Sequence, residues 1–404
     1  MTDRLYYNDP SLREFEATVT GVERAGDRLR VALDRTAFYP TSGGQPFDTG
    51  TLGRLRVIDV VDDNGGTIAH VVENGALEVG DPVHGAIDWP RRFDHMQQHT
   101  GQHVLSAAFE HLFQVRTLSF HLGVAASTID LAREMAADEI AAAEGEANRI
   151  VWEDRPVAIR YASGEEAAAL KLRKEPVRSG TLRLVEVEGF DLSACGGTHV
   201  ARTGAIGVIA VGAWERFKGG QRIEFLCGGR ALERFRRMRD AVTAGVRLLS
   251  VTPEDLAASI ERLLADGREQ KRALDGLKRE LAEHRAAALA ESARAETHNG
   301  REVNVILRAI DADADELKAL SARVTSSPGF VAVLLSTSRP ARAVVARSAD
   351  LPISANEVLA ALTSRFGGRG GGRPEFAQGG GLDGPPAEIL AAAAEHLGFS
   401  KPEA

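Results

Sequence analysis

The sequence predicts a multidomain α+β protein, because patterns of different hydrophobic period follow one another along its 404 residues. Short alternating or β-branched segments separated by Gly, Asp and Asn predict a small antiparallel β-barrel at the N-terminus. Helix-forming runs then mix with strand-like segments, a long helical stretch follows, and a second α/β region ends the chain. We therefore expect four domains, at residues 1–90, 91–230, 231–297 and 298–404.

Composition narrows the class of protein. The chain is 44% hydrophobic and 26% charged, which is typical of a soluble globular protein. No apolar run approaches the roughly 18–20 residues of a membrane-spanning helix, and the N-terminus lacks the apolar core of a signal peptide. Cys195 and Cys227 are too few for a disulfide framework, so we expect a reducing, cytoplasmic location without membrane contact. The net charge of −8 argues against a general nucleic-acid coat protein but allows a local basic face.

The first two expected domains differ in their elements. Polar turns separate the strands of the first domain, which we expect at 15–20, 28–32, 55–61, 67–72 and 83–87. In the second domain, residues 93–113 and 136–152 are rich in helix formers and predict helices. The strands expected in this domain are 182–187, 206–214 and 222–227, the last two joined by a hairpin turn at 218–221.

Residues 231–249 and 253–296 predict helices, and the second helix carries a heptad seam with alternating spacings of four and three residues. Gly267 and Gln270 weaken the middle of this seam. The pattern is consistent with a long antiparallel arm or a dimerising coil, and equally with a helix packed on its own domain. The seam residues are Leu256, Ile260, Leu263, Gly267, Gln270, Leu274, Leu277, Leu281, His284 and Ala288.

From residue 298 onward the chain predicts a compact α/β domain. We expect strands at 303–307, 330–335 and 343–346 and helices at 355–365 and 387–397. A glycine-rich segment at 367–374 carries two arginines, with a third just before it. Because glycine allows close backbone approach and arginine suits phosphate contact, the segment is interpreted as an anion-binding loop, with a simple connector as the alternative.

The spacing of histidine and cysteine indicates a metal site. His95, His99 and His103 recur every four residues and therefore share one face of the helix expected at 93–113. Cys195 and His199 are also four residues apart, and two glycines between them let the chain fold back. Imidazole nitrogens with one thiolate suit Zn²⁺.

We expect the ligands to be His99, His103, Cys195 and His199, with His95 outside the set. The competing interpretation is a buried apolar cysteine with solvated or capping histidines. A peptidase of the His-Glu-x-x-His type is disfavoured, because Thr100 and Gln102 occupy the positions where its glutamate would lie.

These motifs resemble a known family. The segments His99–His103 and Cys195–His199 are similar to the paired metal motifs of alanyl-tRNA editing domains. Phe38–Pro46 resembles the Gly-Gly-Gln loop of that family, and Leu5–Ala17 resembles the opening of the free-standing AlaX editing proteins. Arg222–Glu224 resembles the arginine-bearing strand near the end of the editing domain.

The resemblance extends to the C-terminus. Residues 367–380 are similar to the C-terminal domain shared by alanyl-tRNA synthetase and DHH-type phosphoesterases, although Phe376 replaces the usual Met. The matched segments occur in the expected order over nearly the whole chain. The resemblance implies a long AlaX protein with an N-terminal β-barrel, an editing domain of the threonyl/alanyl-tRNA synthetase second-additional-domain type, a helical coiled-coil arm and a DHHA1-like α/β domain.

The resemblance also implies an activity. The expected barrel begins so close to Met1 that no adenylate-forming domain is expected before it, so the chain should hydrolyse esters and not make them. The implied substrate is tRNA(Ala) mischarged with serine, and with glycine as a second choice, since a pocket for alanine cannot strongly reject either amino acid. The implied cofactor is Zn²⁺. Gln45, Thr41 and Ser42 are the expected substrate contacts, and the expected RNA contacts are Arg222, Arg365, Arg369 and Arg373.

Several alternatives remain open at this point. One is a zinc hydrolase of another small acyl substrate, which would need no basic RNA face. Another is a non-catalytic RNA-binding protein with a structural zinc. A DHH-type phosphoesterase is disfavoured, because Asp94-His95-Met96 only superficially resembles its Asp-rich motifs. Homodimerisation through the helical arm or the C-terminal domain is a further expectation.

Overall fold

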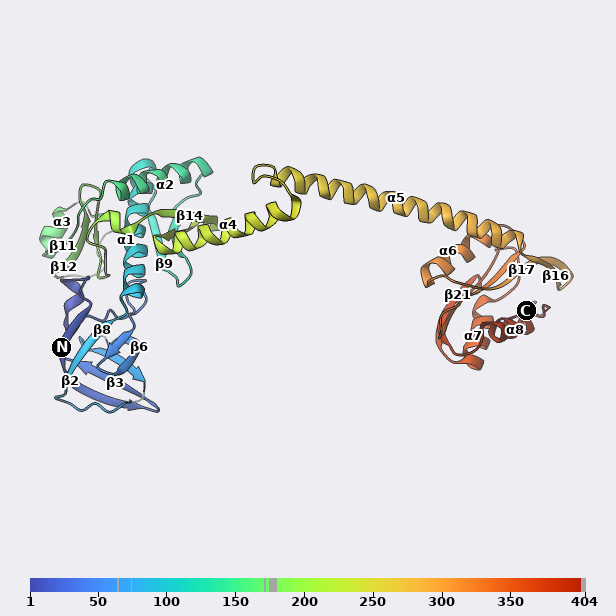
Figure 1. Ribbon diagram of the computed structural model, residues 1–404, viewed down its shortest axis with the longest axis horizontal. Helices are drawn as coiled ribbons and strands as arrows, with labels where there is room; N and C mark the ends of the chain where they lie inside the picture. The colour runs from blue at the N-terminus through green and yellow to red at the C-terminus, as the bar shows by residue number, and fades with distance from the viewer. Residues whose placement is uncertain (64, 74, 171, 174–179, 401–404) are drawn as a thin grey trace. The chain divides into compact units, whose positions relative to one another are not determined.

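The computed structural model describes residues 1–404 except 64, 74, 171, 174–179 and 401–404, and is shown in Figure 1. The chain divides into two compact units, Met1–Leu248 and Leu249–Ala404. Each unit is described by itself. The finer boundaries expected at residues 90, 230 and 297 stay a prediction.

The N-terminal unit begins with a closed six-stranded barrel, which confirms the expected β-barrel. Its core contains fully buried residues such as Val31, Phe38 and Val60. A short parallel pair, β1 (Asp3–Arg4) with β4 (Arg35–Thr36), flanks the barrel. In barrel order the strands are β2 (Glu14–Ala25), β3 (Arg28–Leu33), β7 (Ile68–Glu73), β6 (Leu55–Asp62), β5 (Gly50–Leu52) and β8 (Pro82–Ile87).

Helix α1 (Trp89–Phe113) follows the barrel directly and forms the centre of the N-terminal unit. It begins four residues earlier than expected, since Asp88 caps its first turn and Pro90 suits the N-terminal position. The helix is buried along most of its length, and α2 (Ala137–Trp152) packs against it. A hydrophobic core formed with residues such as Phe109 and Ile150 holds the two helices together.

Two sheets complete the N-terminal unit. The first has the order β14 (Ile209–Phe217), β15 (Gly220–Cys227), β10 (Ser127–Leu131) and β9 (Thr117–Leu122). The second has the order β11 (Val157–Ala162), β12 (Leu182–Val187) and β13 (Asp191–Ala194). The strand expected at 206–214 begins later, because a 3-10 turn occupies Thr203–Ile206. Helix α3 (Gly164–Ala169) follows β11, and α4 (Gly229–Leu249) ends the unit.

The C-terminal unit begins with α5 (Leu256–Glu291), which ends before the expected residue 296 because β16 (Arg294–His298) follows. Most apolar residues of the predicted seam are exposed, including Leu263, Leu274 and Leu277. The last turns pack on the unit, where Ala286 is buried against α6 (Ala314–Val324).

A six-stranded sheet forms the body of this unit. Its order is β16, β17 (Arg301–Ile310), β18 (Phe330–Ser336), β19 (Ala341–Arg347), β21 (Phe376–Leu382) and β20 (Arg369–Arg373). Helices α7 (Ala355–Phe366) and α8 (Pro386–Leu397) cover one face, and α6 with the end of α5 covers part of the other. The glycine-rich segment expected to be a loop is therefore largely an edge strand. No helix in the described part of the chain is long and apolar enough to cross a bilayer.

Candidate metal and active site

Helix α1 presents two of the predicted ligands from its buried face. His99 and His103 are 0% and 4% exposed, and their rings lie 5.4 Å apart, as expected for residues one turn apart. His95 lies one turn earlier and is outside the group. Its Nδ1 is buried without a partner among the described residues.

The other two ligands come from the loop that follows β13. Cys195-Gly196-Gly197-Thr198-His199 folds back so that the Sγ of Cys195 lies 3.3 Å from the Nε2 of His199. The close approach to α1 requires glycine at one position, since a Cβ on Gly197 would lie 2.2 Å from the ring of His99. The fold therefore brings together two segments about ninety residues apart in the chain.

One ligand atom from each of His99, His103, Cys195 and His199 lies within 4.8 Å of the others. We call these four residues the metal cluster. The Sγ of Cys195 also lies 3.4 Å from the Nε2 of His99. Three imidazoles and a thiolate form a donor set that could bind a metal ion, and it is of the kind that zinc prefers.

Each histidine of the metal cluster uses its Nδ1 to bond outward. The Nδ1 of His99 donates to Oε1 of Gln45 at 2.9 Å, and the Nδ1 of His103 donates to Asp191 at 2.9 Å. The hydroxyl of Thr100 donates to a backbone carbonyl, so at 3.2 Å it accepts from the Nδ1 of His199. All three Nε2 atoms are therefore free to face a shared centre, which is the orientation that metal sites use.

Sequence reasoning did not identify Asp191 or Thr100. Thr100 lies inside the His99–His103 motif, but nothing in the sequence distinguishes its hydroxyl from that of a helix-capping threonine. Asp191 lies four residues before Cys195, at the start of β13. A carboxylate near a histidine motif was the only available signal, and it becomes informative only when the strand places it against α1.

The electrostatics of the metal cluster favour thiolate. Burial raises the pKa of Cys195, but the neighbouring imidazoles outweigh it and hold that pKa well below its usual range. Burial lowers the pKa of His103, but the Asp191 carboxylate and the thiolate raise it to about 9. Burial raises the pKa of Asp191, but Arg173 and His103 bring it down to about 2. A metal ion would thus displace a proton from His103 on binding.

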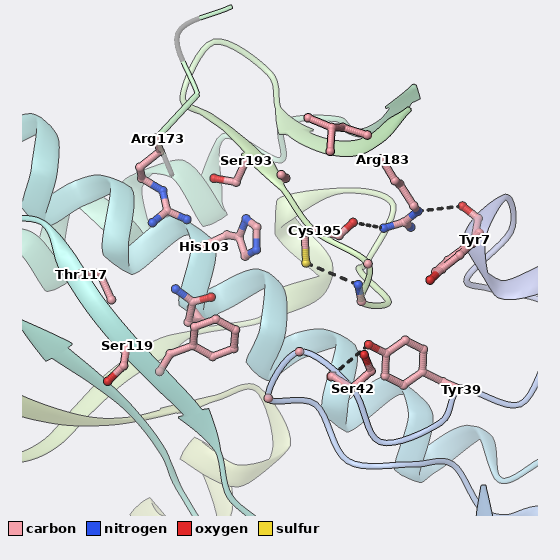
Figure 2. A pocket seen from close by; sticks show the side chains of 18 of the residues that line it. Tyr7, Tyr39, Ser42, His103, Thr117, Ser119, Arg173, Arg183, Ser193 and Cys195 are labelled. Carbon is pink, nitrogen blue, oxygen red and sulfur yellow. Dashed lines mark hydrogen bonds between the residues drawn. The ribbon is translucent and has the colours of Figure 1, made fainter. Parts of the chain in front are cut away.

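A cavity of about 790 Å³ opens beside the metal cluster, and Figure 2 shows side chains that line it. His103 and Cys195 lie at its wall, so ligands of the metal cluster meet the cavity directly. Of the predicted substrate contacts, Ser42 lines the cavity. Thr41 is exposed but does not line it, and its hydroxyl accepts from the backbone N–H of Phe47.

Gln45, the third predicted contact, is completely buried behind His99. Its Oε1 accepts from His99 and from the backbone N–H of Thr198, and its Nε2 donates to the hydroxyl of Thr198 at 2.7 Å. These bonds use both polar atoms of the side chain. The geometry favours a positioning role for Gln45, and its contact with substrate stays a prediction.

The four predicted RNA contacts lie in different surroundings. Arg222 forms a bidentate pair with Asp130 and lies 3.6 Å over the ring of Phe217, and it is not among the residues that line the cavity. Arg365 pairs with Glu395 at 3.4 Å. Arg369 and Arg373 are exposed on the edge strand β20, and no ion pair is seen for either within the described residues.

A shallow groove of about 330 Å³ lies between α6 and strands β19 and β21 of the sheet, and β20 pairs with β21 next to it. Lys318 and Arg342 line it together with one acid, Asp315, and neither cation has a carboxylate partner among the described residues. Strand register places Arg342 and Arg369 on either side of Gly380, on one face of the sheet. We call Lys318, Arg342, Arg369 and Arg373, together with the glycines of β20 between the last two, the basic groove.

Comparison with known proteins gives the class of the chain. Residues 7–91 match the family of class II (A) tRNA synthetases, residues 182–224 match the threonyl and alanyl tRNA synthetase second additional domain, and residues 302–397 match the DHHA1 domain. The fold and the metal cluster thus define a protein of the threonyl/alanyl second-additional-domain class.

Full-length similarity identifies the family within that class. The chain is 32% identical to the alanyl-tRNA editing protein AlaX-L of Pyrococcus horikoshii, over 98% of both chains. It is also 36% identical to the alanine–tRNA ligase of Pyrococcus abyssi over 94% of its own length, but it spans only 42% of that ligase. The ligase of Natronomonas pharaonis gives 36% identity and again 42% of the ligase. The chain belongs to the AlaX-L family of alanyl-tRNA editing proteins.

Proposed function

We propose that this protein hydrolyses the ester bond of tRNA(Ala) mischarged with serine, and more weakly that of tRNA(Ala) mischarged with glycine. The single observation that carries the proposal is the metal cluster, which reaches a cavity large enough for an aminoacyl nucleoside through two of its ligands, His103 and Cys195. Membership of the AlaX-L family supports the tRNA class of the substrate.

We propose Zn²⁺ as the cofactor, held by His99, His103, Cys195 and His199. When bound, zinc supplies a Lewis acid that polarises an ester carbonyl and makes a nearby water more acidic. The protein contributes the orientation of the ligands, through Gln45 on His99 and through the other outward bonds of the metal cluster.

Discrimination against correctly charged tRNA requires a polar group that hydrogen-bonds to the serine hydroxyl. Ser42 is the candidate that a substrate in the cavity can contact, because this residue of the Gly-Gly-Gln loop lines the cavity. Thr41 lies next to it and can act through the conformation of that loop, since its hydroxyl bonds to the backbone of Phe47. An alanyl group offers no hydroxyl, so it gains none of this interaction.

The RNA surface is proposed to lie mainly in the C-terminal unit. Arginines without carboxylate partners suit phosphate, and Arg369 and Arg373 have none among the described residues. Lys318 and Arg342, which sequence reasoning did not select, extend the same face. Arg222 and Arg365 are proposed as weaker contacts, because each already pairs with a carboxylate.

We also propose that two copies of the chain pair along α5. The exposed seam residues Leu263, Leu274, Leu277 and Leu281 support this, because a heptad seam is stable only when it is covered. Light scattering should give twice the chain mass for the wild type. A Leu274→Glu/Leu277→Glu variant should be monomeric, and a monomeric wild type would refute the pairing.

The decisive experiment is deacylation of Ser-, Gly- and Ala-tRNA(Ala) by the purified protein, with elemental analysis of its metal. We expect rapid hydrolysis of the serine ester, slower hydrolysis of the glycine ester and very slow hydrolysis of the alanine ester. Equal rates on the serine and alanine esters would refute the specificity. Undiminished activity after complete metal removal would refute the role of zinc.

A further inference from the structure

The charge of the cavity does not match the aminoacyl group. Two arginines, Arg173 and Arg183, line it, and no carboxylate lies among its described lining residues. The acyl part of an aminoacyl ester carries a positively charged α-ammonium group, which these positively charged arginines would repel. The anionic part of an aminoacyl-tRNA is its phosphodiester backbone.

Arg173 and Arg183 differ in what they already bind. The Nε of Arg173 donates to Asp191 at 2.6 Å, so that arginine shares a carboxylate with His103. Arg183 has no carboxylate partner in the described part of the chain. Its Nε donates to the carbonyl of Tyr7 at 3.0 Å, and its Nη1 donates to the carbonyl of Cys195 at 2.7 Å.

Arg183 is therefore a charge that lacks a counter-charge. The residue is 9% exposed, and its Nη2 is buried with no hydrogen-bond partner among the described residues. A guanidinium stays protonated in a protein, so its burial beside two carbonyls alone is costly unless an anion completes the site. The remaining contact is the ring of Tyr7, whose centroid lies 5.4 Å from the guanidinium carbon.

The position of Arg183 relates this charge to the metal cluster. Figure 2 shows Arg183 beside Cys195 and Tyr7, with Arg173 on the other side of Cys195 in this view. An ester on the ribose and the phosphate on the same nucleoside are separated by only one sugar ring. Tyr7 and Tyr161 also line the cavity, and aromatic rings of this kind can stack on a base.

We propose that Arg183 binds the phosphate of the 3′-terminal nucleotide and so places the aminoacyl ester at the metal cluster. This inference rests on the proposed function, because it assumes an aminoacyl-tRNA substrate. The competing role is structural, in which Arg183 only joins the segment around Tyr7 to the Cys195 loop. A third possibility is that the cavity takes the carboxylate of the free amino acid.

Small ligands separate these roles. Calorimetry of the zinc-loaded full chain should show that 5′-AMP binds about tenfold more tightly than adenosine, as expected for one charge-assisted contact. In Arg183→Gln this difference should disappear, and in Arg183→Lys part of it should remain. Arg160→Gln is the matched control, since Arg160 lies on the adjacent strand β11, is exposed and pairs with Glu186 outside the cavity.

Hydrolysis gives the second measurement. The 3′-seryl ester of 5′-AMP should be cleaved about tenfold more efficiently than the seryl ester of adenosine, mainly through KM, and Arg183→Gln should cleave both alike. If Arg183→Gln lowers activity by the same factor on both esters, so that the tenfold difference between them survives, the inference is overturned. A wild type that binds free serine but not 5′-AMP would also overturn it. Metal content, measured on every variant, identifies any misfolded protein.

The two proposals fail in different ways. If 5′-AMP binds through Arg183 but no seryl ester or Ser-tRNA(Ala) is hydrolysed, the proposed function is wrong and the phosphate site stands. If Ser-tRNA(Ala) is hydrolysed while the phosphate of 5′-AMP makes no difference to binding, the phosphate site is wrong and the proposed function stands.

Discussion

The metal cluster and the basic groove both depend on glycine-rich segments with polar neighbours, yet they are built in opposite ways. In the metal cluster the ligand side chains lie largely inside the protein, and each histidine has an assigned outward partner. In the basic groove Arg369 and Arg373 are exposed, without carboxylate partners in the described chain. A buried site must hold one geometry, whereas an exposed face can spread its affinity over several weak contacts.

Replacement of a glycine should therefore have very different consequences in the two regions. In Gly197→Ala the new Cβ would lie 2.2 Å from His99 and 3.0 Å from Oε1 of Gln45, so that the loop must move away from α1. We expect loss of bound metal and an activity lower by about a thousandfold or more, since metal catalysis contributes several kcal/mol. Metal analysis and deacylation rates measure both effects.

The neighbouring glycine is the control for this prediction. A Cβ on Gly196 would lie 3.7 Å from the hydroxyl of Tyr7, which is an ordinary contact, so Gly196→Ala should keep its metal. Full metal content in Gly197→Ala would show that the loop is more tolerant than the packing indicates.

Stability should respond to acid in the N-terminal unit. His70 is fully buried in the barrel, where its Nδ1 donates to the carbonyl of Val31 and its Nε2 accepts from Thr36. Burial lowers its pKa from 6.5 to about 4. The unfolded chain therefore binds this proton first, and the contribution of His70 is fully present above pH 6.5. It is lost as the pH falls toward 4, by about 3 kcal/mol in the free energy of unfolding.

Tryptophan fluorescence can follow this loss selectively, because Trp89, Trp152 and Trp214 all belong to the N-terminal unit. In His70→Gln the dependence of stability on pH between 6.5 and 4 should be shallower by about one proton. An identical slope in wild type and His70→Gln would contradict the assignment to His70.

The two regions also differ in how far the sequence predicted them. The pairs His99/His103 and Cys195/His199 have fixed local spacings, so the donor set of the cluster followed from the sequence. The barrel and the α1 helix followed from hydrophobic period. The roles of Asp191 and Thr100 as partners of the ligands could not be predicted, because only the tertiary fold brings the β13 segment and α1 together.

Edge strands explain most of the remaining differences between the elements expected from the sequence and those in the structure. Strand β20 is entirely exposed, with glycines at three of its five positions, so neither hydrophobic period nor β propensity marks it as a strand. Its pairing with β21 supplies the stabilisation that the sequence does not show. Residues 294–298 continue a helix-forming stretch, but pairing of β16 with β17 overrides that local preference.

Asp191 tests whether the residues that hydrogen-bond to the metal ligands affect metal binding as strongly as the ligands themselves. In Asp191→Asn the carboxylate that orients His103 becomes an amide, and Arg173 loses its charge partner. We expect zinc affinity to fall by about 10–100-fold, as is usual when an outer partner of a ligand is changed. Competition with a chromophoric chelator measures this directly.

The control for Asp191 is another paired aspartate. Asp130→Asn also removes a carboxylate from an arginine, Arg222, but the described hydrogen bonds of Asp130 go to Arg222 and Ser119 and not to a ligand of the metal cluster. Its zinc affinity should equal that of the wild type. Equal losses in the two variants would mean that general destabilisation, and not ligand orientation, lowers the affinity.

The smallest individual effects are expected in the basic groove. Arg342→Gln, Arg369→Gln and Arg373→Gln should each weaken tRNA binding a few-fold and reduce the salt dependence by about one unit of slope, because each removes at most one phosphate contact. Arg323→Gln is the control, since Arg323 is exposed but pairs with Glu283. Filter binding at several salt concentrations measures affinity and slope together.

A substitution without any charge change completes the test of this groove. Gly371 lies on β20 between Arg369 and Arg373, and nothing lies within 4 Å of a Cβ built there, so Gly371→Leu should fold normally. If glycine serves to let a nucleic-acid backbone approach, the leucine should weaken tRNA binding without changing the salt slope, since no cation is lost. Hydrolysis at saturating tRNA should be unaffected, because the metal cluster lies in the other unit. Unchanged tRNA affinity in Gly371→Leu and in the arginine variants would show that the groove does not bind tRNA.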